Sequence, residues 1–244
     1  MRTNTETAKL PDAEVYELEC DVLPWAALLR EVADWISKHT PSGGRVLDYM
    51  CGTGRLLHDI SKARGDLVLA GCTLDPQSYV DYANARNPAV PVTYCDALAF
   101  QPPWTPDVVV CTGGIHHLPR AQQAPFIQKV ASELPPGGWF IVGDEVIAHA
   151  TSEVTRRMAA LELFTGLASW CIRRQVPDPV QEAVLDILRN DLFERGEYKT
   201  DLDSLCTMLR ESFEVHTVAP VWTVDSTPGA CGDYLIVCRR SLTP

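Results

Sequence analysis

The stretch Arg45-Val-Leu-Asp-Tyr-Met-Cys-Gly-Thr-Gly-Arg55 combines a short apolar run, an acidic residue and a turn of small residues. The apolar run predicts a buried strand ending near Asp48, and residues 55–64 have the apolar spacing of a helix. Gly52 and Gly54 have no side chain, so backbone N–H groups at the start of that helix can approach a ligand closely. The stretch therefore predicts a strand–turn–helix unit that binds a ligand at its turn.

Two common nucleotide-binding motifs do not fit this turn. A dinucleotide-binding turn has a third small residue three positions after the second glycine, where this chain has Leu57. A phosphate-binding P-loop requires Gly-Lys-Ser/Thr, and the turn continues instead with Arg55. The ligand of the turn is therefore expected to belong to another class.

The rest of the chain alternates strand and helix patterns. Near-continuous apolar runs predict parallel strands covered on both faces at residues 45–49, 67–74, 90–95, 107–112 and 139–144. Helices are predicted between them at 55–64, 76–86 and 121–134, and an amphipathic helix precedes them at 23–39. The alternation predicts an α/β fold with a doubly wound parallel sheet.

The alternation of strand and helix patterns ends after the fifth predicted strand. Three helical stretches, at residues 151–174, 178–195 and 202–211, follow one another without a strand between them. Strand patterns return at 213–221 and 233–239, joined by a turn-rich segment. We therefore expect a helical insert followed by a closing antiparallel strand pair.

Size and composition are those of a single globular domain. The chain has 244 residues, of which 46% are hydrophobic and 22% charged, and no apolar run approaches the roughly 18 residues of a membrane span. The net charge of −11 argues against a nucleic-acid substrate. Nine cysteines without a Cys-x-x-Cys motif favour a reducing compartment. We expect a cytoplasmic protein with no nucleic-acid or membrane partner, and a homodimer is compatible with the sequence.

Several motifs, taken in order, resemble those of class I S-adenosylmethionine-dependent methyltransferases of the small-molecule type. Asp48, Gly52 and Gly54 match the first motif, although Met50 stands where its first glycine is usual. The His-His-Leu after the fourth strand and the Leu-Pro-Pro-Gly-Gly loop before the fifth also match. The resemblance covers about residues 40–145 and 198–240. It implies a Rossmann-like, seven-stranded, mostly parallel sheet with a helical lid inserted before the last two strands.

The resemblance also implies S-adenosylmethionine as cofactor and a set of residues that bind it. Asp96 would hold the adenine amine, with the backbone at Ala97 near the adenine ring. The ribose partner stays open between Thr73, at the position where the family usually has an acidic residue, and Asp75, two residues later. The full cofactor set is Asp48, Met50, Cys51, Gly52, Gly54, Thr73, Leu74, Asp75, Asp96, Ala97, Thr112 and Gly113.

The candidates for catalysis are His116, His117 and Glu145, which follow the fourth strand or end the fifth, on the ligand side of the sheet. A histidine could orient the acceptor or remove its proton, but methyl transfer needs a base only when the nucleophile must lose a proton. The alternative is that these side chains are structural. A metal cluster of the same three residues with His149 is also conceivable, yet its spacing is unspecific and we predict no metal.

These inferences give a division of the chain and a function. The division is an N-terminal helical cap (1–40), a cofactor-binding core (41–150), a helical acceptor lid (151–212) and a closing strand pair (213–244). The lid is rich in apolar residues, which favours a small aromatic or apolar acceptor of the kind found in secondary metabolism. The alternatives are a protein or tRNA methyltransferase and a non-catalytic module that binds S-adenosylmethionine.

Overall fold

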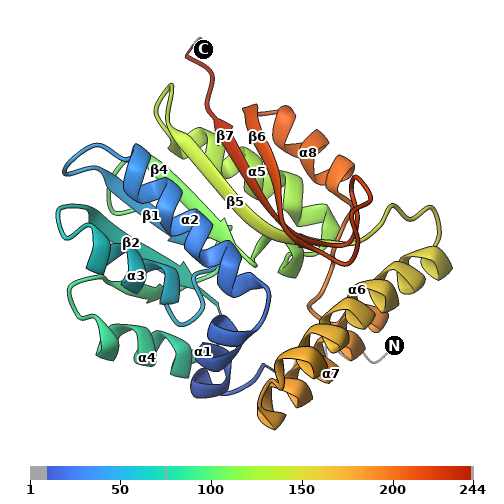
Figure 1. Cartoon of the computed structure of the whole chain (residues 1–244). Helices are drawn as coiled ribbons and strands as arrows, with labels where there is room; N and C mark the ends of the chain where they lie inside the picture. The colour runs from blue at the N-terminus through green and yellow to red at the C-terminus, as the bar shows by residue number, and fades with distance from the viewer. Residues whose placement is uncertain (1–9, 75, 243–244) are drawn as a thin grey trace, which may run out of the picture.

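A single seven-stranded sheet runs through the molecule, with helices on both faces (Figure 1). The structure is a computed structural model, and it describes residues 10–74 and 76–242. The strand order is β3-β2-β1-β4-β5-β7-β6, and β7 is antiparallel to both of its neighbours. The strands are β1 Arg45–Tyr49, β2 Val68–Thr73, β3 Val92–Tyr94, β4 Val108–Thr112, β5 Trp139–Val146, β6 Glu214–Thr223 and β7 Gly232–Arg239.

Eight α-helices and one 3-10 turn lie within the described residues. They are α1 Ala13–Val22, α2 Trp25–His39, α3 Arg55–Ala63, α4 Gln77–Arg86, η1 Ile115–His117, α5 Arg120–Glu133, α6 Glu153–Arg174, α7 Asp178–Phe193 and α8 Leu202–Arg210. In residues 10–74 and 76–242, no helix combines the length and the apolar content needed to cross a membrane.

Two apolar layers hold the helices on the sheet. On one face α2, α3 and α4 cover the strands, and Ile36 and Leu57 pack in one buried cluster with Val110. On the other face α5 and α8 pack in a second cluster, with Phe126 and Phe140 among its largest buried side chains. Because both faces are covered, the strands can be apolar throughout, as their sequences predicted.

The predicted fold class is confirmed: the sheet is seven-stranded and mostly parallel, and the helical insert precedes β6 and β7. Most predicted element bounds differ from the structure by one or two residues. Strand β5 runs on to Val146 instead of ending at Asp144, because its antiparallel pairing with β7 continues as far as Gly232. Strand β3 is shorter than predicted, since it lies at a sheet edge and pairs with β2 alone.

The helix α1 was not predicted, since four acidic residues interrupt the apolar ones in its sequence Ala-Glu-Val-Tyr-Glu-Leu-Glu-Cys-Asp-Val. The Asp12 side chain accepts from the Val15 N–H and caps its first turn. Tertiary contacts with α2, α4 and α7 also stabilise α1. Its position near the carboxyl end of β1 makes it part of the candidate site described below.

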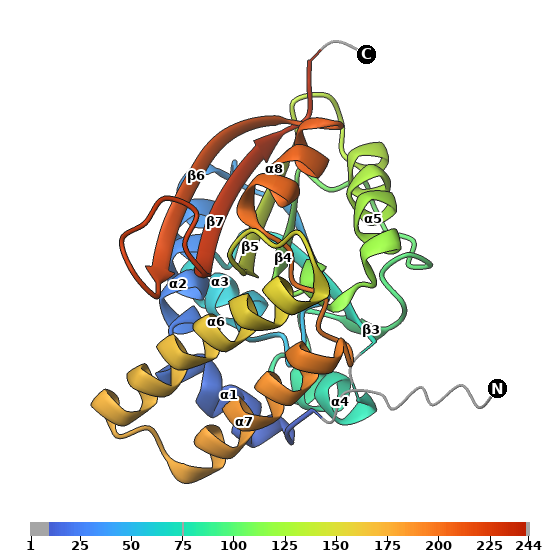
Figure 2. The same ribbon diagram turned by 90° about the vertical axis from the view of Figure 1, so that its right-hand side faces the viewer.

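Helices α6 and α7 lie side by side and apart from the sheet (Figures 1 and 2). Leu163 and Val184 belong to a third apolar cluster that joins these helices to Leu23, between α1 and α2. The Trp170 indole N–H donates to the Val22 carbonyl at 2.9 Å. The insert is therefore fastened to the N-terminal helices, beside the carboxyl ends of the parallel strands.

Candidate active site

A cavity of about 570 Å³ lies at the carboxyl ends of β4 and β5. Its walls come from α1, α2, α7, the turn after β1, the loop after β4 and the facing ends of β5 and β7. Much of the lining is apolar, including Val15, Leu28 and Ile187, while charged groups gather beside the strand ends. This volume lies in the usual range for small-molecule pockets, roughly 300–1,000 Å³.

The turn after β1 has the left-handed backbone that its glycines predicted. Gly52 has φ +52° and Gly54 has φ +69°, and Gly54 leads directly into α3. Met50 also has a positive φ of +56°, which is unusual for a residue with a side chain. The related motif has glycine here because this position needs a left-handed conformation. Met50 adopts it at a cost of about 1–2 kcal/mol.

Helix α1 lies against this turn. A Cβ atom added at Gly52 would come within 2.9 Å of the Tyr16 hydroxyl oxygen. The Thr53 hydroxyl donates to the Glu17 carboxylate, which also forms an ion pair of 2.6 Å with Arg86. α1 therefore closes over the turn, so that a ligand bound there is shielded from water.

Asp48 at the carboxyl-terminal part of β1 provides a test of whether a ligand fits this turn. It is 1% exposed, and neither of its carboxylate oxygens has a hydrogen-bond partner among the described residues. Burial raises the pKa of this carboxyl group well above its usual range. A buried acid without a partner, two residues before the glycine turn, fits a bound molecule that carries a donor or a positive charge.

The predicted cofactor residues fall into two groups. Cys51, Thr112 and Gly113 line the cavity, whereas Thr73 and Leu74 lie at the end of β2. Asp96 and Ala97 lie just after β3, and Asp96 accepts a hydrogen bond from the Leu98 N–H at 2.8 Å.

The turn after β1, with Met50, Gly52 and Gly54, lies between these two groups of predicted cofactor residues. Strands β1, β2 and β3 are parallel neighbours, so their carboxyl ends form one continuous edge. Asp75 lies outside the described residues.

The ribose contact is expected to come from the segment of Thr73 and Asp75. If Asp75 is the partner, Asp75→Ala should weaken cofactor binding roughly 10- to 100-fold, because a hydrogen bond to a charged group contributes about 1.5–3 kcal/mol. Calorimetric titration with S-adenosylhomocysteine measures this affinity. A large loss in Thr73→Val beside a small one in Asp75→Ala would assign the role to Thr73. Unchanged affinity in both variants would contradict the placement of the ribose.

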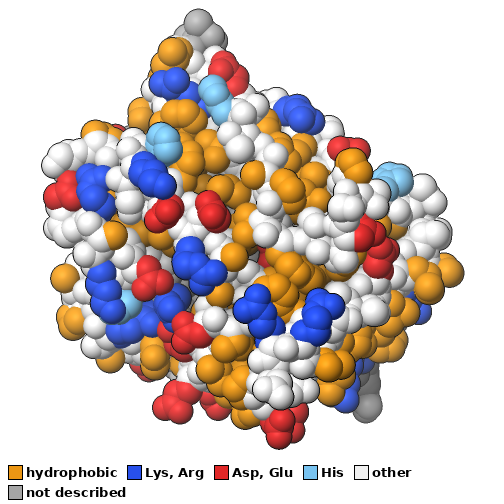
Figure 3. Space-filling model, viewed as in Figure 1, with side chains coloured by type: hydrophobic (Ala, Val, Ile, Leu, Met, Phe, Trp, Pro, Cys, Tyr) orange, Lys and Arg blue, Asp and Glu red, His pale blue; other side chains and the backbone are white. Residues whose placement is uncertain are grey.

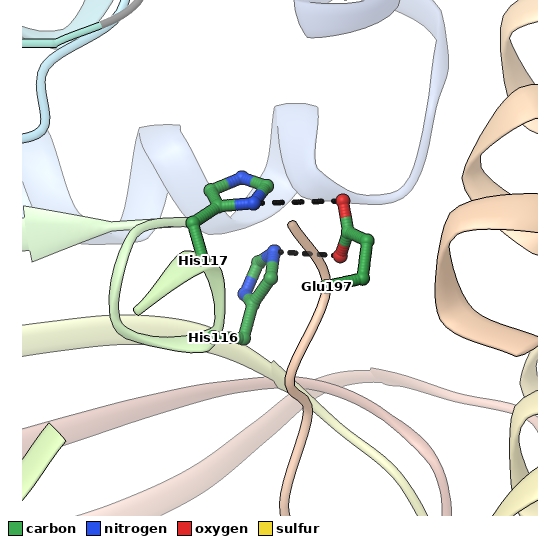
Figure 4. A group of neighbouring side chains, drawn as sticks. All are labelled: His116, His117 and Glu197. Carbon is green, nitrogen blue, oxygen red and sulfur yellow. Dashed lines mark ion pairs between the residues drawn. The ribbon is translucent and has the colours of Figure 1, made fainter. Parts of the chain in front are cut away.

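His116 and His117 form the 3-10 turn after β4 and lie beside Glu197, which comes from the loop between α7 and α8 (Figure 4). The His116 Nε2 is 3.4 Å from one carboxylate oxygen of Glu197, and the His117 Nδ1 is 3.5 Å from the other. On its far side, the His116 Nδ1 is hydrogen-bonded to Asp144. His117 Nδ1 also lies 2.8 Å from the Gly196 carbonyl oxygen. The two histidines thus face one acidic loop.

Lys199 connects this pair to the third predicted residue, Glu145. Its Nζ is 2.6 Å from Glu197, 2.9 Å from Asp191 of α7 and 3.1 Å from Glu145 at the end of β5. The ammonium is thereby surrounded by carboxylates and almost fully buried. A single lysine therefore links the lid helix, the strand end and the histidine turn.

Burial and the neighbouring charges shift the pKa values of His116 and Glu197 in opposite directions. Burial disfavours the charged form of His116, but the carboxylates of Asp144 and Glu197 outweigh it and raise its pKa to about 9. Burial also opposes ionisation of Glu197, yet Lys199 and the two histidines lower its pKa to about 2. His116 is therefore an imidazolium held between two carboxylates at neutral pH.

This charge state predicts a pH-dependent stability. A pKa raised from 6.5 to about 9 in the folded state stabilises the protein fully below pH 6.5, and this contribution is lost as the pH rises through 9. We expect the stability advantage of the wild type over His116→Gln to fall by up to roughly 3 kcal/mol across that interval. Urea denaturation at a series of pH values measures it, with the partly exposed His216→Gln as control. A pH-independent difference would contradict the protonation assigned to His116.

Three side chains could hold a metal ion by distance alone. His116, His117 and Glu197 each offer a ligand atom, and these atoms lie within 4.8 Å of one another. In this structure Glu197 forms ion pairs with the Lys199 ammonium at 2.6 Å and with the His116 imidazole at 3.4 Å. The fourth residue of the alternative weighed from the sequence, His149, lies elsewhere: it is 3.4 Å from Asp201, and its side chain is 71% exposed.

Four further residues are buried at the site and were not predicted from the sequence: Glu197, Lys199, Asp191 and Asp233. Asp191 was assigned to a lid helix, Asp233 to a closing strand, and the segment Glu194-Arg-Gly-Glu-Tyr-Lys-Thr200 has the composition of a solvated loop. The Glu-x-Lys pair in the short segment between the lid and the last helix is the sequence feature that could have pointed to these buried charges. Only the folded chain brings this pair to the histidines.

Known proteins share both the sequence profile and the fold. Residues 46–138 match a family described as "Methyltransferase domain". The chain is 27% identical over 188 residues to the ubiquinone biosynthesis O-methyltransferase of Albidiferax ferrireducens, covering 68% of this chain and 74% of that protein.

Two solved structures share the architecture. The N-methyltransferase NodS from Bradyrhizobium japonicum, in complex with S-adenosyl-L-homocysteine, has a TM-score of 0.57 at 15% identity, covering 94% of this chain and 99% of that chain. An O-methyltransferase family protein from Burkholderia thailandensis has a TM-score of 0.60 at 13% identity, covering 93% of this chain and 59% of that chain. At these identities, the two likenesses establish the fold alone.

The profile matched over residues 46–138, the sheet order and the glycine turn agree with the resemblance to class I S-adenosylmethionine-dependent methyltransferases. The chain is an S-adenosylmethionine-dependent methyltransferase, and its cofactor is S-adenosylmethionine.

Proposed function

We propose that this enzyme transfers a methyl group to a small metabolite bound in the cavity between the sheet, α1 and α7. One observation carries the proposal: the same cavity is lined by Cys51 and Gly113, from the predicted cofactor set, and by His117 and Glu145, from the predicted catalytic set. Donor and acceptor could therefore meet inside one enclosed volume, where proximity accelerates the transfer.

In this proposal the chain provides binding, alignment and exclusion of water. S-adenosylmethionine, when bound, supplies an activated methyl group on a sulfonium. Asp48 and the turn from Met50 to Gly54 would hold it, because Asp48 has no partner among the described residues and the turn after it has the left-handed glycines of the related motif. α1 would shield it, since Glu17 fastens this helix to Thr53 and Arg86.

The proton-accepting role in this proposal falls to His117. Its Nδ1 lies 2.8 Å from the Gly196 carbonyl oxygen, which favours a proton on Nδ1 and leaves Nε2 as the acceptor. His116 is already protonated between Asp144 and Glu197, so its role is to position the acidic loop. Glu145 would contact the acceptor, since it lines the cavity beside Lys199.

The acceptor we propose has a compact apolar or aromatic body, as many secondary metabolites do. The apolar lining from α1, α2 and α7 supports this, because such walls exclude a strongly hydrated molecule. The names of the relatives point to methylation of oxygen in one case and of nitrogen in another. They support methyl transfer as the reaction without choosing the acceptor atom.

Methylation of a protein or a tRNA is the competing function. On the face seen in Figure 3, Lys and Arg side chains are interspersed with Asp and Glu, an arrangement that gives little attraction for a phosphate backbone. A third function, cofactor binding without transfer, is disfavoured by the charged groups gathered at the cavity, which such a module would not need.

The test is a mass-spectrometric screen. The purified enzyme and S-adenosylmethionine are incubated with fractionated small-molecule extracts, and separately with tRNA and protein fractions. We expect small molecules that gain one methyl group, together with formation of S-adenosylhomocysteine. Methylation confined to tRNA or protein would overturn the proposal. Cofactor binding without any methylated product would support the non-catalytic module.

A further inference from the structure

Two acidic residues face each other across the neighbouring strands β5 and β7 in the cavity wall. Glu145 of β5 and Asp233 of β7 are direct cross-strand partners, and both line the cavity. Glu145 is 9% exposed and Asp233 only 1%. Among the described residues, Glu145 Oε1 and Asp233 Oδ2 have no hydrogen-bond partner. A buried carboxylate oxygen without a donor is destabilising, so these atoms are suited to a ligand that donates.

A third acid lines the same cavity. Glu19 of α1 is 3% exposed, and its Oε1 also has no partner among the described residues. Burial raises the pKa of Glu19 to about 8. Carboxylic acids from both α1 and the β5–β7 pair therefore border the space that the acceptor would occupy.

The cations nearby do not balance these acids. The carboxyl groups connected through this cluster are Asp144, Glu145, Asp191, Glu197 and Asp233. The two buried cations, Lys199 and His116, both contact Glu197, and Lys199 also contacts Asp191 and Glu145. Burial, with further contributions from Glu145 and Asp144, raises the pKa of Asp233 well above its usual range. The site is short of positive charge on the side of Glu145 and Asp233.

The excess of acidic groups favours some classes of methyl acceptor over others. An oxygen or carbon nucleophile must lose a proton and approach as a developing anion, which surrounding carboxylates disfavour. A nitrogen nucleophile reacts as a neutral amine, and its product is a cation that carboxylates stabilise. An amine also supplies N–H donors for Glu145 Oε1 and Asp233 Oδ2, the two oxygens without a partner among the described residues.

We propose that the acceptor is a primary or secondary amine on an apolar body, with its nitrogen held by Glu145 and Asp233. This inference rests on the proposed function. The amine enters as an ammonium ion and gives one proton to the Nε2 of His117. The freed lone pair forms a bond to the methyl carbon while the electrons of the carbon–sulfur bond return to sulfur. The positive charge passes from sulfur to nitrogen, the N-methylated ammonium leaves, and His117 releases its proton to water.

The binding test compares amines with alcohols of the same skeleton. The probes are 2-phenylethylamine against 2-phenylethanol and hexylamine against hexanol, titrated calorimetrically into the enzyme with S-adenosylhomocysteine present. We expect each amine to bind at least about tenfold more tightly than its alcohol. Equal or tighter binding of both alcohols, or no amine binding up to about 10 mM, would overturn the inference.

Two variants locate the preference within the site. Glu145→Gln and Asp233→Asn keep the side-chain shape and remove the carboxyl group that would pair with the bound ammonium, and each should reduce the amine preference by about tenfold or more. Asp233→Asn should fold normally, because it keeps the side-chain shape and replaces a buried acid whose Oδ2 has no partner among the described residues. Glu31→Gln, on an exposed position of α2, is the matched control and should keep the preference. Amine preference that persists in both site variants would overturn the assignment.

The product screen separates this inference from the proposed function. Small-molecule products methylated on nitrogen would support both, and the methylated atom can be identified by NMR. Products methylated only on oxygen, carbon or sulfur would overturn the amine assignment and leave the proposed function intact. An absence of any methylated small molecule, beside tight cofactor binding, would overturn both.

Discussion

Gly52→Val is expected to lower the affinity for S-adenosylmethionine at least about 100-fold, a loss of roughly 3 kcal/mol. Gly52 has φ +52°, and the space beside its Cα is limited by the Tyr16 hydroxyl group at 2.9 Å from a Cβ position. A branched side chain there would occupy the path by which the cofactor reaches the turn. Calorimetric titration with S-adenosylmethionine and with S-adenosylhomocysteine measures the loss.

The control must separate blocked binding from backbone strain. Gly43 has φ +72° in the turn before β1, and a Cβ there would meet no atom within 4 Å. Gly43→Val therefore brings a comparable left-handed strain without entering the site, so its cofactor affinity should be near that of the wild type. Unchanged affinity in Gly52→Val, with the circular-dichroism spectrum intact, would show that the turn does not bind the cofactor.

Removing the His117 imidazole is expected to lower turnover by about 10²–10⁴-fold, while cofactor affinity stays nearly unchanged. His117 lines the cavity, and its Nδ1 faces Gly196 and Glu197, so Nε2 is the atom available for a proton. Steady-state kinetics of His117→Ala, with the acceptor identified by the product screen, measures the effect.

His149→Ala is the matched control for this variant. His149 is exposed and lies 3.4 Å from Asp201, outside the histidine pair, so its loss should leave turnover close to normal. Near-normal turnover in single alanine variants of His117, His116 and Glu145 would mean that the enzyme works by proximity alone. The histidines would then hold the loop around Glu197 and take no part in proton transfer.

Much of the fold follows from the sequence because its signals are local. The apolar runs of β1 and β4, the helix stop at the Pro-Pro-Gly-Gly segment before Trp139 and the alternation of patterns require no knowledge of distant contacts. Gly52 and Gly54 were recognisable for the same reason, since a left-handed turn restricts the residue that can occupy it. The placement of His116 and His117 at the carboxyl edge follows from their position just after a parallel strand.

The acidic half of the site depends on contacts across the chain. Asp233 faces Glu145 only because β7 pairs with β5 in one register, and a shift of one residue would turn its side chain to the other face of the sheet. Lys199 reaches Glu145 and Asp191 only because the lid returns its loop to the strand ends. Likewise, α1 is a weakly patterned helix until the glycine turn and α7 give it partners. The sequence by itself determined the fold class and the glycine turn that we propose as the cofactor site, through local backbone preferences and apolar periodicity. The tertiary structure decided which buried charges meet, because electrostatic interactions depend on distances that local sequence does not specify.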